Sequence, residues 1–368
     1  MKIVQLVPAM EQGGVERGVV EMNRALVRAG HVNTVVSAGG RLVERIVADG
    51  GRHITMDVKS KNPLTYFSRA YALRRILREV SPDVVVAHSR VPAWLFVWAN
   101  RALGLKWITF AHGANSVSRY SRIMTAGDVT VTPSRYIADY LKSAYGTPEA
   151  KLRVIPRAIE RERFDTSALD ADFMAAKKRE WGVEGRKVVM GLGRITQLKG
   201  YDTLIKATEI VRRTVPNVKT VIVGEAEELR KDVESSLREL VHSLALEDAV
   251  VFAGNQQKVA ECLGIADVVV SANTRKPEAF GRSMAEALAM NRPVVATAFG
   301  GALDIVQDGV NGFLVPQSHA DANGFAEAIA HALSTDFGDV RSAALEKFSF
   351  DRMVSRSLSV YEEFARHI

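Results

Sequence analysis

The most constraining feature of the sequence is an alternation of short apolar runs, rich in β-branched residues, with longer segments of helical period. The predicted strands of the first half are KIVQLV (2–7), NTVVSA (33–38), DVVVAH (83–88), KWITFA (106–111), DVTVTP (128–133) and LRVIP (152–156). Those of the second half are KVVMGLG (187–193), KTVIVG (219–224), AVVFAG (249–254), DVVVSA (267–272) and PVVAT (293–297). This order is typical of βαβ units, so it predicts parallel sheets covered by helices.

Helical segments separate the predicted strands and divide the chain into domains. They lie at 14–30, 63–80, 92–104, 134–144, 200–214, 227–245 and 320–334. A polar connection ends near Gly185, where the second set of strands begins, so we expect a domain over residues 1–157, a second over 158–347 and a closing helix over 348–368. Ligands of such sheets bind beyond the carboxyl ends of the strands, so two facing domains predict a ligand cleft between them.

Composition excludes several classes of protein. The 368 residues are 47% hydrophobic and 25% charged, which is typical of soluble globular proteins and not of disordered or fibrous chains. The longest apolar stretch, at 92–99, is far shorter than the ~20 residues that a membrane-spanning helix needs. The opening residues read as a strand and not as a secretion signal. Because Cys262 is the single cysteine, a reducing, cytoplasmic compartment is expected.

The charge is distributed unevenly along the chain. Residues 1–157 carry 23 Lys+Arg and 11 Asp+Glu, a net +12, whereas residues 158–368 carry 26 and 31, a net −5. A basic first domain favours an anionic partner, which is a nucleic acid, an anionic membrane surface or a phosphorylated substrate. A solvated basic surface without a specific partner is the alternative.

The most informative segment is EAFGRSMAEALAMNRPVVAT, at 278–297, which follows a predicted strand and opens a predicted helix. Residues 279–281 form the turn, so the free amides of the next helix face the ligand and suit a phosphate group. Glu278 precedes the turn and Glu286 lies on the helix, so two carboxylates can accept hydrogen bonds from the hydroxyl groups of one ligand. A pair of surface glutamates beside a helix dipole is the alternative.

A second informative segment is GLGRITQLKGYDTLI, at 191–205, which begins in a predicted strand. Gly193 and Arg194 lie in the following loop, and Lys199 lies where the next helix begins. A guanidinium and an ammonium at a helix N-terminus form a receptor for a diphosphate. The stretch is not a dinucleotide fingerprint, because Thr196 stands at the third glycine position, and the sequence has no GxxxxGK[ST] phosphate loop. Hydride transfer and P-loop chemistry are therefore disfavoured.

Together these residues resemble the signature of the retaining GT-B glycosyltransferases, family 4 of the carbohydrate-active enzymes: Arg194, Lys199, Glu278 and Glu286. MEQGGVERGV (10–19) resembles that family's glycine-rich first loop, AHG (111–113) its histidine loop, and residues 348–368 its closing helix. The resemblance covers nearly the whole chain. It implies an α/β fold of the GT-B type, with two doubly wound Rossmann-like domains that face an interdomain cleft.

The resemblance also implies roles for individual residues. In that family the basic pair holds the donor diphosphate, the second glutamate holds the ribose, and the first glutamate and the loop amides hold the transferred sugar. The implied catalytic residues are Arg194, Lys199, Glu278 and His112, and the resemblance implies that His112 contacts the donor sugar near the reacting centre. The implied donor-binding residues are Gly13, Gly14, Gly193, Arg194, Lys199, Glu278, Phe280, Gly281 and Glu286. The alternative for His112 is a structural role, as a histidine at a strand end whose hydrogen bonds are satisfied.

The mechanism implied by the resemblance is front-side sugar transfer with retention and without a metal or other cofactor. Charge arranged around the leaving diphosphate would then supply most of the catalysis. A metal-dependent transferase needs a DxD motif, and the one DxD, Asp170 to Asp172, lies in the predicted connection between domains. One departure from the family is the hinge, which reads IPRA at 155–158 where many relatives read IPNG. Arg157 therefore leaves the hinge geometry open.

The basic first domain is expected to bind the acceptor. Arg119 and Arg122 are the acceptor-binding candidates, with His88 and Arg90 as weaker ones, and ordinary solvated arginines are the alternative. The apolar segment around Trp94, Phe96 and Trp98 predicts a buried helix. Segment 59–78 combines apolar residues with Lys59, Lys61, Arg69, Arg74, Arg75 and Arg78. It predicts peripheral contact with an anionic membrane at its inner, cytoplasmic face.

These observations predict a metal-independent hexosyltransferase with a nucleotide-sugar donor, a UDP-sugar ahead of a GDP- or ADP-sugar, and a glycan or lipid-linked acceptor. The EAFGR segment resembles the lipopolysaccharide-core and surface-glycan branch of the family. A GT-B-fold nucleotide-sugar epimerase is one alternative, although it does not require a basic acceptor domain. A nucleic-acid-binding protein is the other, but it explains only the basic half, so no nucleic-acid partner is expected.

Overall fold

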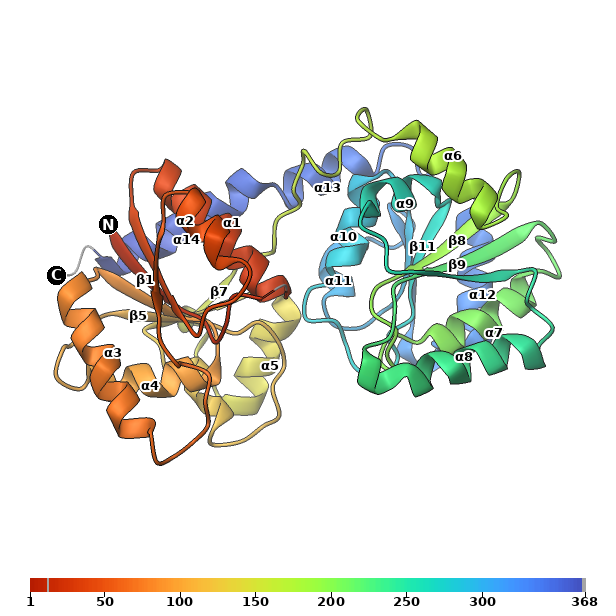
Figure 1. Cartoon of the computed structure of the whole chain (residues 1–368). Coiled ribbons are helices and arrows are strands. Elements are labelled where there is room, and N and C mark those ends of the chain that lie inside the picture. Colours follow the sequence, from red (N-terminus) through yellow and green to blue (C-terminus); the bar gives the residue numbers. More distant parts are fainter. Residues whose placement is uncertain (12, 366–368) are drawn as a thin grey trace. The chain divides into compact units, whose positions relative to one another are not determined.

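The computed structural model describes residues 1–11 and 13–365 of the chain. The chain packs as two compact units, one formed by Met1–Arg157 with Asp351–Ile368 and the other by Ala158–Phe350. Each unit contains a parallel sheet with helices packed on both of its faces (Figure 1). The predicted fold class, two Rossmann-like α/β domains, is confirmed. A cleft between the domains stays a prediction.

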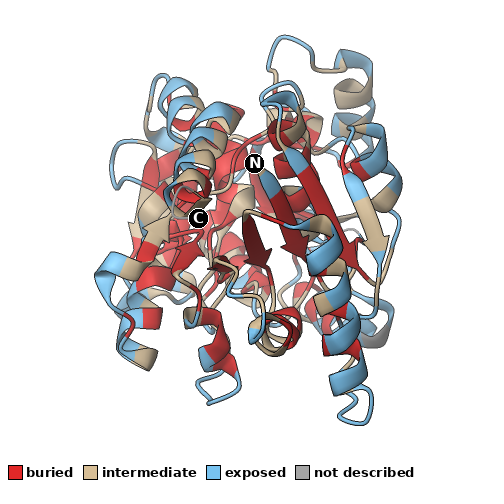
Figure 2. Cartoon of the chain, turned by 90° about the vertical axis from the view of Figure 1, so that its left-hand side faces the viewer, coloured by how far each residue is buried: buried red, intermediate tan, exposed pale blue. Residues whose placement is uncertain are grey.

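The sheet of the first unit has seven strands in the order β3-β2-β1-β4-β5-β6-β7. They are β1 (Lys2–Leu6), β2 (Val32–Ser37), β3 (Arg52–Thr55), β4 (Val84–Ala87), β5 (Trp107–Phe110), β6 (Val129–Thr132) and β7 (Leu152–Val154). All pairs are parallel, and Ile3 of β1 lies between Asn33 of β2 and Val84 of β4. Because helices cover both faces, the central strands are buried on both sides and mostly apolar. These strands are red, and therefore buried, in Figure 2.

Helices surround this sheet in the order in which βαβ units place them. They are α1 (Gly14–Arg28), α2 (Val43–Ala48), α3 (Tyr66–Val80), α4 (Arg90–Asn100), α5 (Arg135–Tyr145) and α14 (Phe350–Ala365), with short 3-10 turns η1 (Ser121–Thr125) and η2 (Glu149–Lys151). The closing helix α14 packs on this unit, because Val360 and Tyr361 share a buried cluster with Ile3 and Val84. The predicted segment 348–368 reaches past residue 365 and so extends outside the described residues.

The sheet of the second unit has six strands in the order β10-β9-β8-β11-β12-β13. They are β8 (Lys187–Leu192), β9 (Val218–Val223), β10 (Val250–Gly254), β11 (Val268–Ser271), β12 (Val294–Thr297) and β13 (Gly312–Val315). Its helices are α6 (Ala171–Glu180), α7 (Tyr201–Val211), α8 (Lys231–Ser243), α9 (Val259–Ile265), α10 (Arg282–Ala289), α11 (Ala302–Ile305), α12 (Ala322–Ser334) and α13 (Arg341–Lys347). Two further 3-10 turns are η3 (Glu228–Arg230) and η4 (Gln317–His319).

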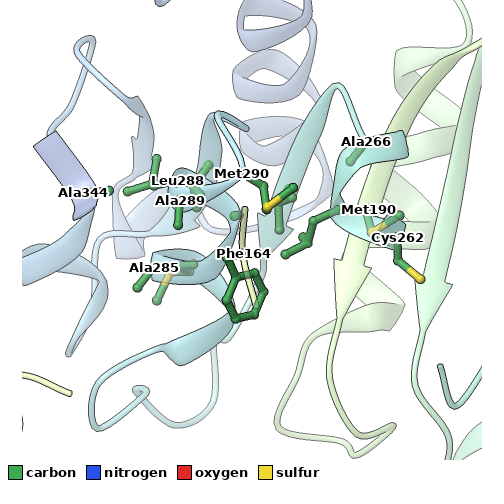
Figure 3. Packing of buried hydrophobic residues seen from close by; sticks show 14 of the residues in the cluster. Phe164, Met190, Cys262, Ala266, Ala285, Leu288, Ala289, Met290 and Ala344 are labelled. Atoms are coloured by element: carbon green, nitrogen blue, oxygen red, sulfur yellow. The ribbon is translucent and has the colours of Figure 1, made fainter. Parts of the chain in front are cut away.

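Two apolar clusters, one on each face, fix this second sheet. One contains Phe164, Met190, Cys262 and Leu288, which Figure 3 labels among the buried side chains of this cluster. The other lies under α7 and α12 and contains Phe325. Cys262 is a buried free thiol, and burial raises its pKa to about 12, so it stays protonated at neutral pH.

Two edge strands and two aromatic residues differ from the sequence-based expectations. Strands β3 and β13 were not predicted, because one is short and only half-buried and the other begins with a glycine. The predicted buried helix is α4, in which Phe96 is buried, but Trp94 and Trp98 are only partly covered. Both residues line a pocket beside α4.

Two cations of segment 59–78 are structural and not available to a membrane. Arg69 is 8% exposed and donates hydrogen bonds to the carbonyl oxygens of Ser60 and Asn62 at 2.9 and 3.1 Å. Arg74 donates to the carbonyls at the end of α4, with 2.9 Å to that of Ala99. The expectation that these two arginines belong to a solvent-facing basic surface is therefore wrong, because buried carbonyl groups need these donors.

Candidate functional site

The loop after β8 carries the first group of candidate residues in the second unit. Gly193 adopts φ 138° and Gly200 adopts φ 66°, a left-handed backbone region that favours glycine. A Cβ atom on Gly200 would lie 1.8 Å from the carbonyl oxygen of Ala272, so no side chain fits there. Gly200 is the N-cap of α7, and Lys199 therefore stands directly before the first turn of this helix, as predicted.

Lys199 forms an ion pair with Glu278, and the two residues come from neighbouring strands. Lys199 follows β8 and Glu278 follows β11, and these strands pair side by side in the sheet. The Lys199 ammonium donates to the Glu278 carboxylate, to which Asn273 also donates at 3.3 Å. The Lys199 and Glu278 side chains are 24% and 25% exposed, so the pair is partly desolvated and still reachable by a ligand.

The turn at 279–281 presents its backbone and not its side chains. Phe280 is 5% exposed, and its ring lies 5.5 Å from that of Phe348, so the phenyl group belongs to the core. Gly281 adopts φ 100° and is the N-cap of α10, without a side chain that caps the helix. The first amides of α10 therefore suit an anionic group, because helix N-termini carry partial positive charge.

Glu286 is the most buried carboxylate of the candidate site. It lies on α10, is 9% exposed, and accepts a hydrogen bond from Nε of Arg282 at 3.0 Å. The guanidinium of Arg282 also contacts Glu160, with 3.4 Å between Nη2 and Oε1. Burial raises the pKa of Glu286 above its ordinary value, and the positive charges of Arg282 and Arg163 oppose this rise.

Arg194 lies further out than Lys199 and contacts a different carboxylate. Its guanidinium pairs with Glu227, and the two side chains are 74% and 55% exposed. Arg194 is therefore mobile enough to turn toward a ligand at little cost, because exposed ion pairs contribute little free energy. Sequence reasoning expected Arg194 and Lys199 to act on one diphosphate, whereas in this structure each cation is paired with its own glutamate.

In the first unit, the glycine-rich loop and the histidine loop meet through Arg157. Gly13 is the N-cap of α1 and Gly14 its first residue, and the carbonyl of Gly14 accepts from Arg157 at 3.0 Å. Arg157 also contacts Nδ1 of His112 at 2.9 Å. The other ring nitrogen of His112 lies 3.0 Å from His88, so both nitrogens are engaged. Gln12 of this glycine-rich loop lies outside the described residues.

The weaker candidates have different surroundings from those expected. His88 is 8% exposed, and burial, followed by the charge of Arg157, lowers its pKa to about 3. It is therefore a buried neutral residue, and the expectation that it meets an anionic acceptor at the surface is wrong. Arg119 and Arg122 are exposed between β5 and β6, where they stay predictions for acceptor binding. Arg90 donates to the hydroxyl of Ser121 at 3.1 Å.

An aromatic pocket lies in the first unit beside α4. Its volume is about 360 Å³, within the range of small-molecule sites. It is lined by Ser60, Lys61, Tyr66, Val91, Trp94, Trp98 and Tyr120. Hydrogen bonds hold the rings in place, since the Tyr66 hydroxyl donates to the carbonyl of Trp94 at 2.8 Å and the indole of Trp94 donates to that of Tyr120 at 3.0 Å.

The candidate metal motif has another role in this structure. Asp170 caps α6, accepting from the amide of Phe173 at 2.9 Å, and also pairs with Lys258. Across residues 1–11 and 13–365, no three His, Cys, Asp or Glu side chains are grouped so as to hold a metal ion. In the same part of the chain, no helix combines the length and the apolar character needed to cross a membrane.

Several site residues were missed by sequence reasoning. Arg282 stands four residues before Glu286 on one helix, and this spacing was a usable signal. Gln5, whose side-chain oxygen lies 2.9 Å from Nε2 of His88, was visible as a polar residue inside an apolar strand. Glu160 had no local signal, because it meets Arg282 through a contact between segments 122 residues apart. Asn273 lies only five residues before Glu278, but this spacing belongs to a loop and not to a helix or strand.

The fold and the site together define a class of protein. The chain has two Rossmann-like units. In the second unit Lys199 and Glu278 follow adjacent strands, and Glu286 lies on the helix that begins after Glu278. These are the features of a GT-B glycosyltransferase. Two family models match the chain, "Glycosyl transferases group 1" over residues 174–346 and "Glycosyltransferase Family 4" over residues 12–163.

Similarity to curated proteins shows the family. The chain is 31% identical over 291 residues to a GDP-mannose-dependent alpha-(1-6)-phosphatidylinositol monomannoside mannosyltransferase of Mycolicibacterium smegmatis, covering 75% of this chain and 72% of that protein. It is 30% identical over 243 residues to an uncharacterised glycosyltransferase of Methanocaldococcus jannaschii, covering 63% of this chain and 59% of that protein. The chain therefore belongs to the group 1 glycosyltransferases.

Solved structures show the same fold. A glycosyltransferase from Rickettsia africae superposes with a TM-score of 0.90 at 28% identity, over 100% of this chain and 99% of that one. An Anabaena protein crystallised in complex with UDP superposes with a TM-score of 0.84 at 20% identity, over 99% and 100%.

Proposed function

We propose that the protein transfers a hexose-type sugar from a nucleoside-diphosphate sugar to a glycan or lipid-linked acceptor, with retention of configuration and without a metal ion. The observation that carries this proposal is the convergence of Lys199, Glu278 and the uncapped N-terminus of α10 at the ends of two adjacent strands. Glu286 lies on α10, just beyond this N-terminus. The second unit is accordingly the donor-binding unit.

Lys199 and Arg194 are assigned to the leaving diphosphate. Each is paired with a single carboxylate in the structure, and a diphosphate carries more negative charge than one carboxylate. Donor binding therefore replaces Glu278 and Glu227 as the partners of these cations, which frees Glu278 to accept hydrogen bonds from sugar hydroxyls. Fixed cations that face the developing charge lower the barrier without a further cofactor.

Glu286 is assigned to the ribose. The guanidinium of Arg282 holds its carboxylate in one orientation, so the oxygens need no reorganisation when vicinal hydroxyls bind. The backbones of Gly193, Phe280 and Gly281 complete the donor site. Phe280 contributes only main-chain groups, because its ring is buried in the core.

A UDP-sugar is the proposed donor and a GDP-sugar the second candidate. The neighbouring Anabaena structures contain UDP and UDP-glucose, which favours uracil. The mycobacterial relatives are GDP-mannose-dependent, which favours guanine. The EAFGR segment supports a place in lipopolysaccharide or other surface-glycan synthesis.

The first unit is assigned to the acceptor. Its basic charge and its aromatic pocket suit a ligand that has both an anionic part and an apolar face. Beside the pocket, Leu64, Phe67 and Tyr71 are exposed by 90%, 62% and 61%. Exposed Lys59, Lys61, Arg75 and Arg78 on the same segment support peripheral contact with an anionic cytoplasmic membrane surface.

A thermal-shift screen with UDP, GDP, ADP and their glucose and mannose conjugates tests the donor assignment. A ligand that binds the native state raises its unfolding temperature with concentration. The cognate nucleotide should stabilise the parent and a Lys206→Ala control, whose exposed lysine lies further along α7, but stabilise Lys199→Ala much less. The absence of a shift with every nucleotide would contradict the proposal. Incubation with the nucleotide sugar alone distinguishes an epimerase, which would form an isomerised product.

A further inference from the structure

Six hydrogen bonds connect polar side chains of the first unit into one continuous row. From Arg157 the row passes through His112 (2.9 Å), His88 (3.0 Å), Gln5 (2.9 Å), Asn33 (3.1 Å) and Asn23 (2.8 Å) to the carbonyl oxygen of Ile46 (3.1 Å). Gln5, Asn23 and Asn33 are at most 1% exposed. Burial of a polar side chain costs folding free energy unless its donors and acceptors are hydrogen-bonded. Apolar side chains would fill the same space without this requirement, so the row indicates a role beyond packing.

The strand order explains how the row forms. Asn33 lies on β2, Gln5 on β1, and His88 and His112 directly follow β4 and β5. In the sheet these strands are adjacent in the order β2-β1-β4-β5, so each side chain lies beside the next. Arg157 reaches the row from the segment after β7 and is the residue at which the hinge departs from the IPNG pattern.

Each end of the row fixes the direction of every hydrogen bond in it. Arginine only donates, so Nδ1 of His112 must accept, and the proton of this imidazole must be on Nε2. His112 then donates to Nδ1 of His88, which in turn donates from Nε2 to the amide oxygen of Gln5. A carbonyl only accepts, so the opposite end independently requires each amide of the row to donate toward Ile46. The two requirements agree.

This direction requires both imidazoles to be neutral. A second proton on His112 would point at the guanidinium of Arg157, and one on His88 would point at the N–H of His112. The charges that act on the pair are consistent with this requirement. Burial and the nearby Arg157 lower the pKa of His88 to about 3, and burial, Arg157 and His88 lower that of His112 well below its usual range.

We propose that Gln5 and His88 are positioning residues that hold His112 as a neutral imidazole with an unprotonated Nδ1. The protonation of the row depends only on its hydrogen bonds. Its effect on turnover rests on the proposed function, because that function gives His112 its part in the reaction.

Nitrogen-15 NMR of histidine side chains in the ligand-free protein tests this proposal. Substitutions of His88 and His112 by glutamine assign their signals among the eight histidines. For both residues we expect a protonated Nε2 and an unprotonated Nδ1, without titration between about pH 5 and 8, where an unperturbed histidine titrates. A protonated Nδ1, or titration of either ring in this range, would overturn the assignment.

Two substitutions separate positioning from a merely structural role. Gln5→Glu keeps an acceptor for His88, but its negative charge favours a protonated His88, so His88 should titrate in this pH range and turnover should acquire the same pH dependence. Gln307→Glu, the same change at an exposed site of the second unit, should alter neither. In Arg157→Met the proton of His112 should stay on Nε2, because the Ile46 end still fixes the direction. A shift of the proton to Nδ1 would contradict the row.

If no nucleotide sugar stabilises the protein, the proposed function fails and the turnover result loses its meaning, while the ligand-free NMR result stands independently.

Discussion

Replacement of Lys199 by alanine tests the centre of the proposed donor site. The Lys199 ammonium contacts the carboxylate of Glu278, and about a quarter of each side chain is exposed. For such a partly desolvated position an effective dielectric constant of about 20 applies, at which two unit charges about 4 Å apart interact by about 4 kcal/mol. The ammonium should therefore interact strongly with a diphosphate that takes the place of Glu278.

The expected loss of activity follows from this electrostatic term. Removal of one preorganised contact to developing negative charge costs about 3 to 4 kcal/mol, or roughly 100- to 1000-fold in kcat. We therefore expect Lys199→Ala to lower turnover by at least ~100-fold, and Arg194→Ala to do the same. Loss of the partly exposed pair should lower the free energy of unfolding by only about 1 kcal/mol, so the variant should remain folded.

Initial rates of sugar transfer, measured with the donor selected by thermal shift, provide the assay. Lys206→Ala removes an exposed lysine from the same helix and should keep the parent rate. Lys199→Arg retains the charge and should recover part of the lost activity. Unchanged turnover in both Lys199→Ala and Arg194→Ala, with folding intact, would refute the diphosphate assignment.

Four further predictions concern metal dependence, the ribose, stability and the membrane. Activity should survive EDTA, and complete loss that manganese or magnesium restores would refute metal independence. Glu286→Gln should weaken nucleotide binding by roughly 10-fold or more in calorimetric titration, because hydrogen bonds to a charged acceptor contribute about 1.5 to 3 kcal/mol; equal affinity would remove Glu286 from the ribose. The pKa of His88 is about 3 in the folded protein and 6.5 ordinarily, so on acidification the unfolded chain binds a proton at His88 before the folded protein does. The contribution of neutral His88 to the free energy of unfolding is therefore full above about pH 6.5 and is lost as the pH falls toward 3. Urea unfolding of His88→Gln should show a weaker loss of stability between about pH 6.5 and 4 than the parent, and identical profiles would contradict this. Finally, the protein should sediment with anionic but not neutral vesicles at low salt and be released at high salt, and glutamine at Lys59, Lys61, Arg75 and Arg78 should abolish this binding; a quadruple variant that binds like the parent would exclude this surface. Arg69 and Arg74 are left intact in that variant because they hold main-chain carbonyls.

The class of fold and the local backbone of the donor residues could be predicted from the amino-acid sequence alone. β-Branched runs between helical segments specify parallel sheets, since both periods depend on residues close together in the chain. The position of Lys199 before α7, and that of Glu278 before the turn into α10, depend on neighbouring glycines in the same way. The backbone of these segments was therefore predictable from short stretches of sequence.

Which side chains are partners, in contrast, depends on contacts between distant segments of the chain. The link from Glu286 through Arg282 to Glu160 joins two segments that local spacing does not relate. The burial of Phe280 likewise results from contacts made by distant parts of the chain, here with Phe348.

The row from Arg157 to Asn23 shows the same division most clearly. Gln5 was recognisable as a polar residue in an apolar strand, and His112 as a histidine at a strand end. Their connection required the order in which β2, β1, β4 and β5 pair in the sheet. Hydrogen-bond direction and protonation depend on what each atom faces in space, and the pairing of strands, not the neighbours in sequence, determines what each atom faces.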